Sequence, residues 1–130
     1  MFSIDPMSRI PVYEQIIDQV WKFVAAGLLS PGDQLPSVRS LSVELSVNPN
    51  TIQKAFSELY SRGLITSVPG RGSFISSSAP AIIRQKDREK TADLVDIVKR
   101  LHAAGMSKEE LITLVEETIS SETYKEDDRK

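Results

Sequence analysis

Apolar residues recur at intervals of three and four in the first half of the chain, the spacing that places them on one face of a helix. A first helix is predicted from about Pro11 to Ala26, because proline suits a helix entry and Gly27 suits the position just after a helix end. A second, shorter helix is predicted after Ser37, a suitable N-cap, and its apolar side consists of Val38, Leu41 and Leu45.

The third predicted helix has the clearest start signal in the sequence. Asn48 can cap it, and Pro49 suits its first position because the N–H that proline lacks has no helical partner there. Gly63 marks its end, and its apolar face consists of Ile52, Ala55, Phe56 and Leu59. The opposite face therefore presents small polar groups and one ammonium group to solvent, on Asn50, Thr51, Gln53, Lys54 and Ser57.

Two short strands are predicted next, at residues 64–68 and 73–76. The glycines Gly70 and Gly72 between them allow a tight hairpin tip that pushes the single cation Arg71 outward. A serine-rich stretch then marks a change of composition. We place a domain boundary there, with one domain at residues 1–78 and a second, helical region at residues 79–130.

The second region carries two narrow apolar stripes at helical spacing. Ser107 and Glu110 form a capping box between the stripes, and the charged segment 122–130 is expected to fray. Two short helices of this kind cannot bury both of their sides alone, so we expect residues 91–121 to form a homodimer, although part of this face could instead pack on the first domain. The apolar positions that would drive dimerisation are Leu94, Ile97, Val98, Leu101, Leu111, Leu114, Val115 and Ile119.

Composition excludes several classes of protein. The chain has no cysteine and a single histidine, His102, which argues against a disulfide scaffold, a thiol nucleophile and a typical zinc site. No catalytic constellation or phosphate-binding loop is evident, so we expect no enzyme activity, no metal and no cofactor. No apolar run approaches the roughly 18 residues of a membrane span, and the first ten residues do not resemble a signal peptide. These features predict a cytoplasmic protein without a membrane partner.

Charge is informative only in its distribution. The formal net charge is −2, and residues 1–76 hold six basic and six acidic side chains, so overall charge gives no reason to expect nucleic acid. Two short helices followed by a third with an apolar back and a polar front nevertheless predict a helix-turn-helix. Amide side chains on that front can pair with adenine edges, and its threonine and lysine can reach bases or phosphates. Arg39 would lie near the same DNA backbone and contact a phosphate or a base, and Arg71 suits contact with the minor groove or a phosphate.

Four motifs follow one another across residues 10–76. They are Pro31-Gly32-Asp33-Gln34-Leu35-Pro36-Ser37-Val38-Arg39, then Leu41…Leu45…Val47, then Asn50-Thr51…Ala55…Leu59…Gly63-Leu64-Ile65, and finally Gly70-Arg71-Gly72-Ser73-Phe74. Together they resemble the winged-helix DNA-binding domain of GntR-family bacterial transcription regulators. The short two-helix tail resembles the YtrA-like subfamily, in which this part is a small dimerisation unit. The resemblance implies a mainly helical fold with a small β-hairpin.

The resemblance also implies where DNA would bind. The candidate residues lie at the start of the second helix, along the third helix and on the hairpin: Ser37, Arg39, Asn48, Asn50, Thr51, Gln53, Lys54, Gly70, Arg71 and Gly72. It implies sequence-specific binding to a double-stranded operator, usually as a repressor, and for YtrA-like proteins control of a neighbouring transporter operon. With a homodimer, the operator would be an inverted repeat. Whether a small-molecule effector binds is left open.

One departure from the family pattern concerns the third helix. Many members carry arginine at the two positions that here hold Pro49 and Gln53. Fewer cations predict fewer guanine contacts and a flatter salt dependence, so the operator sequence of relatives does not transfer.

Alternatives remain for several of these features. The near-neutral first domain is also compatible with a winged-helix adaptor that binds a protein or RNA partner. Arg39 could form a structural ion pair with Asp33 or Glu44, and Arg71 could be an ordinary exposed turn residue. The aromatic side chains Trp21, Phe56, Tyr13 and Tyr60 are expected in or beside the core, and His102 on the surface.

Overall fold

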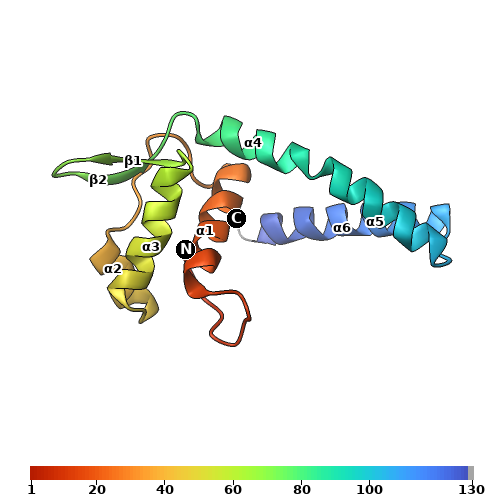
Figure 1. Ribbon diagram of the computed structural model, residues 1–130, viewed down its shortest axis with the longest axis horizontal. Coiled ribbons are helices and arrows are strands. Elements are labelled where there is room, and N and C mark those ends of the chain that lie inside the picture. Colours follow the sequence, from red (N-terminus) through yellow and green to blue (C-terminus); the bar gives the residue numbers. More distant parts are fainter. Residues whose placement is uncertain (129–130) are drawn as a thin grey trace. The chain divides into compact units, whose positions relative to one another are not determined.

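The computed structural model describes residues 1–128, with side chains as far as Ser121, and divides into two compact units, Met1–Arg88 and Glu89–Lys130 (Figure 1). The elements of the first are α1 (Val12–Ala25), α2 (Val38–Leu45), α3 (Pro49–Ser61), β1 (Ile65–Val68), β2 (Gly72–Ile75) and α4 (Ala79–Glu89). Those of the second are α5 (Thr91–Ala103) and α6 (Lys108–Asp128). The predicted mainly helical fold with one small hairpin is confirmed.

A single apolar core holds the first unit together. Both α1 and α2 pack against α3, which lies in the middle of the unit (Figure 1). The apolar faces predicted for the three helices meet in this core, where the fully enclosed side chains include Ile16, Val20, Leu41, Ile52 and Leu59. The hydrophobic effect therefore fixes which side of α3 is left for solvent.

The hairpin pairs with a third stretch of backbone that the sequence did not reveal. β1 and β2 form the predicted antiparallel pair, within about a residue of the expected ends. The loop before α2 runs along the other edge of β2. There the Ile75 N–H donates to the carbonyl of Asp33 at 2.9 Å, and the Leu35 N–H donates to the carbonyl of Ser73 at 2.9 Å. These bonds tie the entry of α2 to the hairpin.

The serine-rich stretch after β2 is part of the first unit and not a linker. Ser76 is buried, and its Oγ donates to the carbonyl of Gly63 at 2.6 Å. α4 then begins, and its side chains Ala79 and Ile83 are enclosed in the core. The first unit consequently extends to Arg88, beyond the boundary expected at residue 78, because the apolar side of α4 completes the core.

Polar side chains of α1 hold two flanking segments in place. Trp21 Nε1 donates to the carboxylate of Asp87, near the end of α4, at 3.0 Å. On the other flank, the Gln15 amide donates to two backbone carbonyls of the N-terminal segment, residues 1–10, at 2.9 and 3.1 Å. Phe2 of that segment is buried. The N-terminal segment therefore packs on the first unit, a feature that no periodicity in the sequence indicated.

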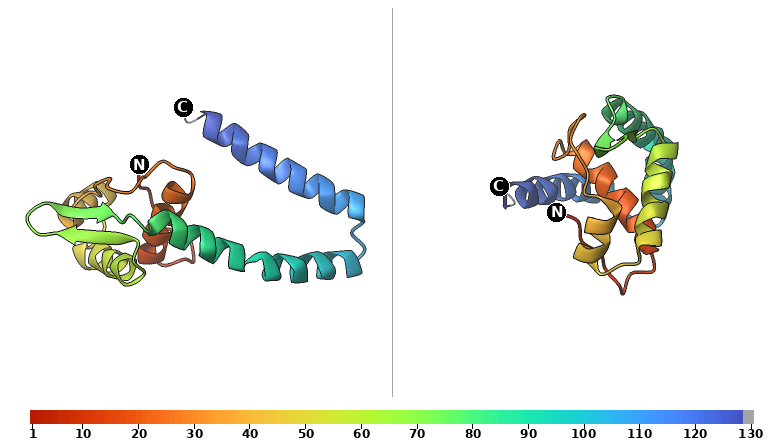
Figure 2. Two further views of the ribbon diagram at one scale, coloured as in Figure 1. Left: turned by 90° about the horizontal axis from the view of Figure 1, so that it is seen from above. Right: turned by 90° about the vertical axis from the view of Figure 1, so that its left-hand side faces the viewer.

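The second unit is the predicted pair of helices. One half of the predicted capping box is present at the start of α6, where Ser107 Oγ accepts from the Glu110 N–H at 3.1 Å. α5 and α6 diverge from the turn between them and make few contacts with each other (Figure 2). None of the side chains from Thr91 to Ser121 is buried. This unit therefore has no enclosed apolar core within the described residues.

The last helix continues to Asp128, through most of the segment 122–130 for which fraying is expected. The last two residues of the segment expected to fray, 129–130, lie outside the described residues. Across residues 1–128, no helix combines the length and the apolar character that a membrane span requires.

Candidate nucleic-acid interface

The outer side of α3 carries the predicted base-reading side chains. Asn50 and Gln53 are exposed, and Thr51 is half-buried. Gln53 Nε2 donates to Ser57 Oγ, one turn later, at 3.3 Å. The first turn of α3 contains no acidic residue that would repel a phosphate. The surface therefore offers exposed amides of the kind that form paired hydrogen bonds with adenine.

The two N-caps predicted at the starts of α2 and α3 are confirmed. Ser37 Oγ accepts from the Ser40 N–H at 3.0 Å, and Asn48 Oδ1 accepts from the Asn50 N–H at 2.8 Å. Pro49 occupies the first position of α3, as predicted. Because these bonds engage the side-chain oxygens, Ser37 and Asn48 position the two helix starts. Their direct contact with DNA remains a prediction.

Lys54 lies toward α1. Its Nζ is 4.0 Å from the centroid of the Tyr13 ring, a cation–π contact across the α1–α3 interface. The Tyr13 hydroxyl donates to Glu14 Oε1 at 3.1 Å, and this bond together with the charge of the carboxylate raises the pKa of the tyrosine. Lys54 is therefore held at the flank of α3, and a role in binding phosphate remains a prediction.

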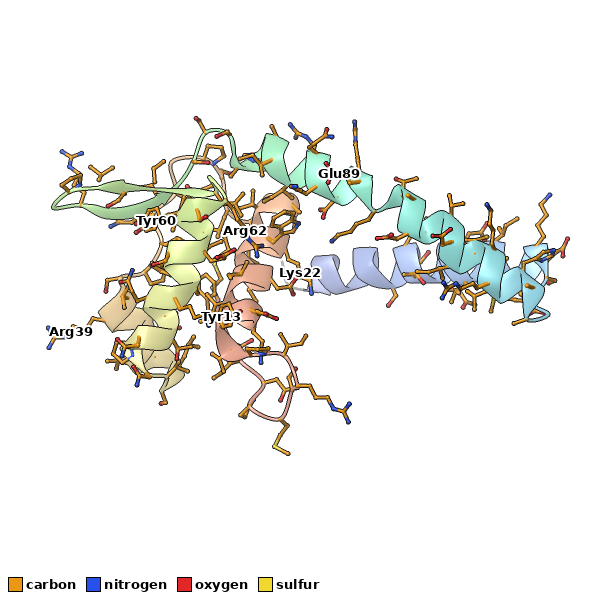
Figure 3. The ribbon with its side chains drawn as sticks, in the orientation of Figure 1. Tyr13, Lys22, Arg39, Tyr60, Arg62 and Glu89 are labelled. Carbon is orange, nitrogen blue, oxygen red and sulfur yellow. The ribbon has the colours of Figure 1, made fainter. Side chains whose placement is uncertain are left out.

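Arg39 extends outward from the first turn of α2 (Figure 3). Its side chain is exposed. Among the described residues it forms no ion pair, so the structural pairing with Asp33 or Glu44 considered from the sequence is not present. The guanidinium is thus available for an external anion.

The tip of the hairpin is a tight turn built on two glycines. Gly70 has φ +77° and Gly72 has φ +119°, both in the region that side-chain-bearing residues avoid. The Arg71 N–H donates to the carbonyl of Val68 at 2.9 Å and closes the turn. Arg71 itself is exposed, as predicted.

Ion pairs show how residues 1–76, whose side chains carry no net charge, can still leave cations available. Lys22 Nζ lies 2.9 Å from the carboxylate of Asp18 on α1, and Arg62 Nε lies 3.2 Å from Glu58 at the end of α3. These pairs neutralise charge along α1 and the last turns of α3. Arg39 is not paired in this way. The start of α2 therefore carries an available positive charge even though residues 1–76 have no net charge.

Two side chains that position the hairpin were missed in the sequence. Gln34 Nε2 donates to the backbone carbonyl of Arg71 at 2.6 Å. The Tyr60 hydroxyl, on the last turn of α3, is hydrogen-bonded to the hydroxyl of Ser73 on β2. Tyr60 was expected only at the edge of the core, where it does lie. Neither bond could be predicted from a local sequence pattern, because the two residues that form it are distant in the sequence.

The remaining candidates have structural surroundings. Phe56 is buried and Trp21 packs against the core, as predicted. His102 is exposed on α5, and its Nδ1 lies 3.0 Å from the carbonyl of Met106. Within the described part of the chain, no group of three histidine or carboxylate residues is arranged to hold a metal ion.

Sequence comparison places these features in a family. The model of the bacterial regulatory proteins of the gntR family matches residues 12–75. The HTH-type transcriptional repressor YtrA of Bacillus subtilis (strain 168) is 39% identical over 118 residues, which are 90% of this chain and 91% of YtrA. The predicted resemblance to YtrA-like members is therefore confirmed over nearly the whole of both chains.

Solved structures agree with the sequence match. The crystal structure of a transcriptional regulator from Oenococcus oeni is similar with a TM-score of 0.71 and 32% identity, over 89% of this chain and 97% of that chain. The crystal structure of AraR(DBD) in complex with operator ORX1 is similar with a TM-score of 0.52 and 29% identity, over 58% of this chain and 96% of that chain. These matches are to regulators and not to enzymes. This chain belongs to the GntR family of bacterial regulatory proteins and is a DNA-binding transcription regulator with a winged helix-turn-helix.

Proposed function

We propose that this regulator binds an inverted-repeat operator as a homodimer and represses transcription there. The outer side of α3 carries the proposal, because its amide side chains are exposed while its apolar side is enclosed. We assign base recognition to Asn50 and Gln53, and contacts with the phosphate backbone to Arg39 and Arg71. The crystal structure of AraR(DBD) with an operator supports the use of this fold on duplex DNA.

The second unit supports the homodimer. Leu94 and Ile97 on α5 are 55% and 53% exposed, and Val115 on α6 is 51% exposed. Full burial of such side chains contributes roughly 1.5–3 kcal/mol each, from which the ordering cost of association is subtracted. A second copy of α5 and α6 would cover these stripes. A two-fold dimer presents two copies of α3, which matches the symmetry of an inverted repeat.

Repression would follow from obstruction of a promoter by the bound dimer. YtrA of Bacillus subtilis is named a repressor, and its similarity to this chain supports the same sign of regulation. We extend the proposal to a transporter operon as the regulated unit and to the cytoplasm as the site of action. The exposed amides and the operator complex of AraR favour this function over the adaptor alternative, in which the same face binds protein or RNA.

The test is capture of genomic fragments by the purified full-length protein at two salt concentrations, followed by sedimentation of the protein with the enriched fragment. We expect an inverted repeat bound by two chains. A double variant, Asn50→Ala with Gln53→Ala, should lose the enriched motif while keeping salt-dependent binding to unrelated DNA. Enrichment without an inverted repeat, or one chain per fragment, would contradict the proposal.

A further inference from the structure

The side chain of Gln34 packs against the tip of the hairpin. Its Nε2 donates to the backbone carbonyl of Arg71 at 2.6 Å. The same nitrogen lies 2.9 Å from the point where a Cβ on Gly72 would be, so any larger residue there would displace it. Gln34 belongs to the loop that precedes α2, which also borders β2 through backbone pairing with Phe74.

The other hydrogen bonds from the first unit to the hairpin are made at Ser73 and Ile75 on β2, below the tip. The side chains of β1 are exposed from Thr66 to Val68. Both strands are short, with four residues each. A short two-stranded hairpin is marginally stable without additional packing. Within the tip, the Arg71 N–H bond to Val68 closes the turn but attaches it to nothing outside the hairpin. The Gln34 amide is the contact that links the Arg71 backbone to another segment of the chain.

We propose that Gln34 is a positioning residue for the wing: its amide fixes the backbone at Arg71 so that the exposed guanidinium approaches the DNA from one direction. The inference rests on the proposed contact between Arg71 and DNA. Gln34 would act by reducing the conformational freedom that the wing loses on binding. Its effect on affinity therefore depends on the presence of the Arg71 side chain.

The test is a double-mutant cycle on the operator with the full-length protein. Gln34→Met keeps the length of the side chain and removes the N–H donor. We expect it to weaken binding by roughly two- to tenfold, the value of one neutral hydrogen bond, and to flatten the salt dependence toward that of Arg71→Ala. In the Arg71→Ala background the same change should have almost no effect. Gln85→Met is the matched control, because Gln85 is an exposed glutamine on α4 whose side chain forms no hydrogen bond with the described residues.

The outcomes of the cycle and one further readout separate the possible failures. Equal losses from Gln34→Met with and without Arg71 would show that Gln34 contacts the DNA itself, and no loss would show that the wing needs no such link; both overturn the inference. Backbone heteronuclear NOE values of Gly70, Arg71 and Gly72 in the free protein should fall in Gln34→Met and not in Gln85→Met, and unchanged values also overturn the inference. If the wild-type protein enriches no operator, the proposed function fails, whereas an additive cycle on a bound operator refutes only the role of Gln34.

Discussion

The two units of this chain differ in how far they bury their apolar side chains. In the first, three helices, a hairpin and α4 enclose residues such as Ile52 and Leu59, which are 0% exposed. In the second, α5 has no buried residue, and Leu94 remains 55% exposed. The first unit has a complete core, while the described side chains of the second unit include no buried apolar residue.

This difference indicates that the two units have separate roles. Because the first unit has its own core, it can hold a polar surface in a fixed geometry without a partner. The described side chains of the second unit form no enclosed core, so we expect its folded state to gain stability from association. DNA recognition and assembly are therefore expected to respond to different substitutions.

The largest effect is expected from truncating the core of α3. Leu59→Ala should lower the free energy of unfolding by about 2–5 kcal/mol, since it leaves a cavity among enclosed side chains. Leu94→Ala is the matched change on α5, and at protein concentrations where the chain is monomeric it should cost much less. Urea unfolding followed by circular dichroism measures both. Comparable losses would show that the second unit has a core of its own.

The next effect concerns assembly. Ile97→Glu places a charge within the exposed apolar stripe of α5 and should raise the dissociation constant of the dimer by about 100-fold, because a charge buried without a partner is costly. Ala92→Glu adds the same charge on the opposite side of the helix and should leave the dimer intact. Analytical ultracentrifugation distinguishes the two. If both variants remain dimeric, the association does not use α5.

The third effect separates base recognition from backbone contact within the first unit. Gln53→Ala should reduce the preference for one base pair by roughly 1–3 kcal/mol, because it removes one hydrogen-bonding amide from the outer side of α3. Arg39→Ala should instead weaken binding to all sequences and reduce the salt slope by about 1. Competition binding with single-base operator variants measures both quantities. A uniform loss for Gln53→Ala would contradict its assignment to base recognition.

Local signals in the sequence predicted much of this architecture. Asn48 as the cap and Pro49 as the first residue define the start of α3 without help from the rest of the fold. Ser107 defines the start of α6 in the same way. The apolar faces of α1 to α3 follow from spacing alone. The exposed face of α3, and with it the candidate site, could be predicted because it is the complement of those faces.

Contacts between distant segments could not be predicted in this way. α4 has few apolar side chains followed by a charged run, and its place in the core depends on its fit near Gly63. Lys54 appeared to be a free cation, but Tyr13 from another helix lies beneath it. Gln34 and Arg71 are 37 positions apart. Each of these contacts is determined by tertiary packing, which spacing along the chain does not encode.

The smallest expected effect tests the polar contacts of Tyr13 on α1. The hydrogen bond to Glu14 raises the pKa of Tyr13, so the folded chain holds this proton more tightly than the unfolded chain. The resulting stabilisation is present below about pH 10, the ordinary pKa of tyrosine, and is lost as the pH rises through the raised value. Tyr13→Phe removes the titrating hydroxyl and keeps the ring beneath Lys54.

The unfolding free energy of Tyr13→Phe should therefore decline less steeply above pH 10 than that of the wild type. Urea unfolding at several alkaline pH values gives the two slopes. Tyr13→Leu, which also removes the ring, serves as the companion variant: it should show the same shallow slope but lower stability at neutral pH, because the cation–π contact is lost as well. Identical slopes for wild type and Tyr13→Phe would mean that the Glu14 bond does not persist in solution. Because this contact lies wholly within the first unit, the dimer dissociation constant should be unchanged in both variants.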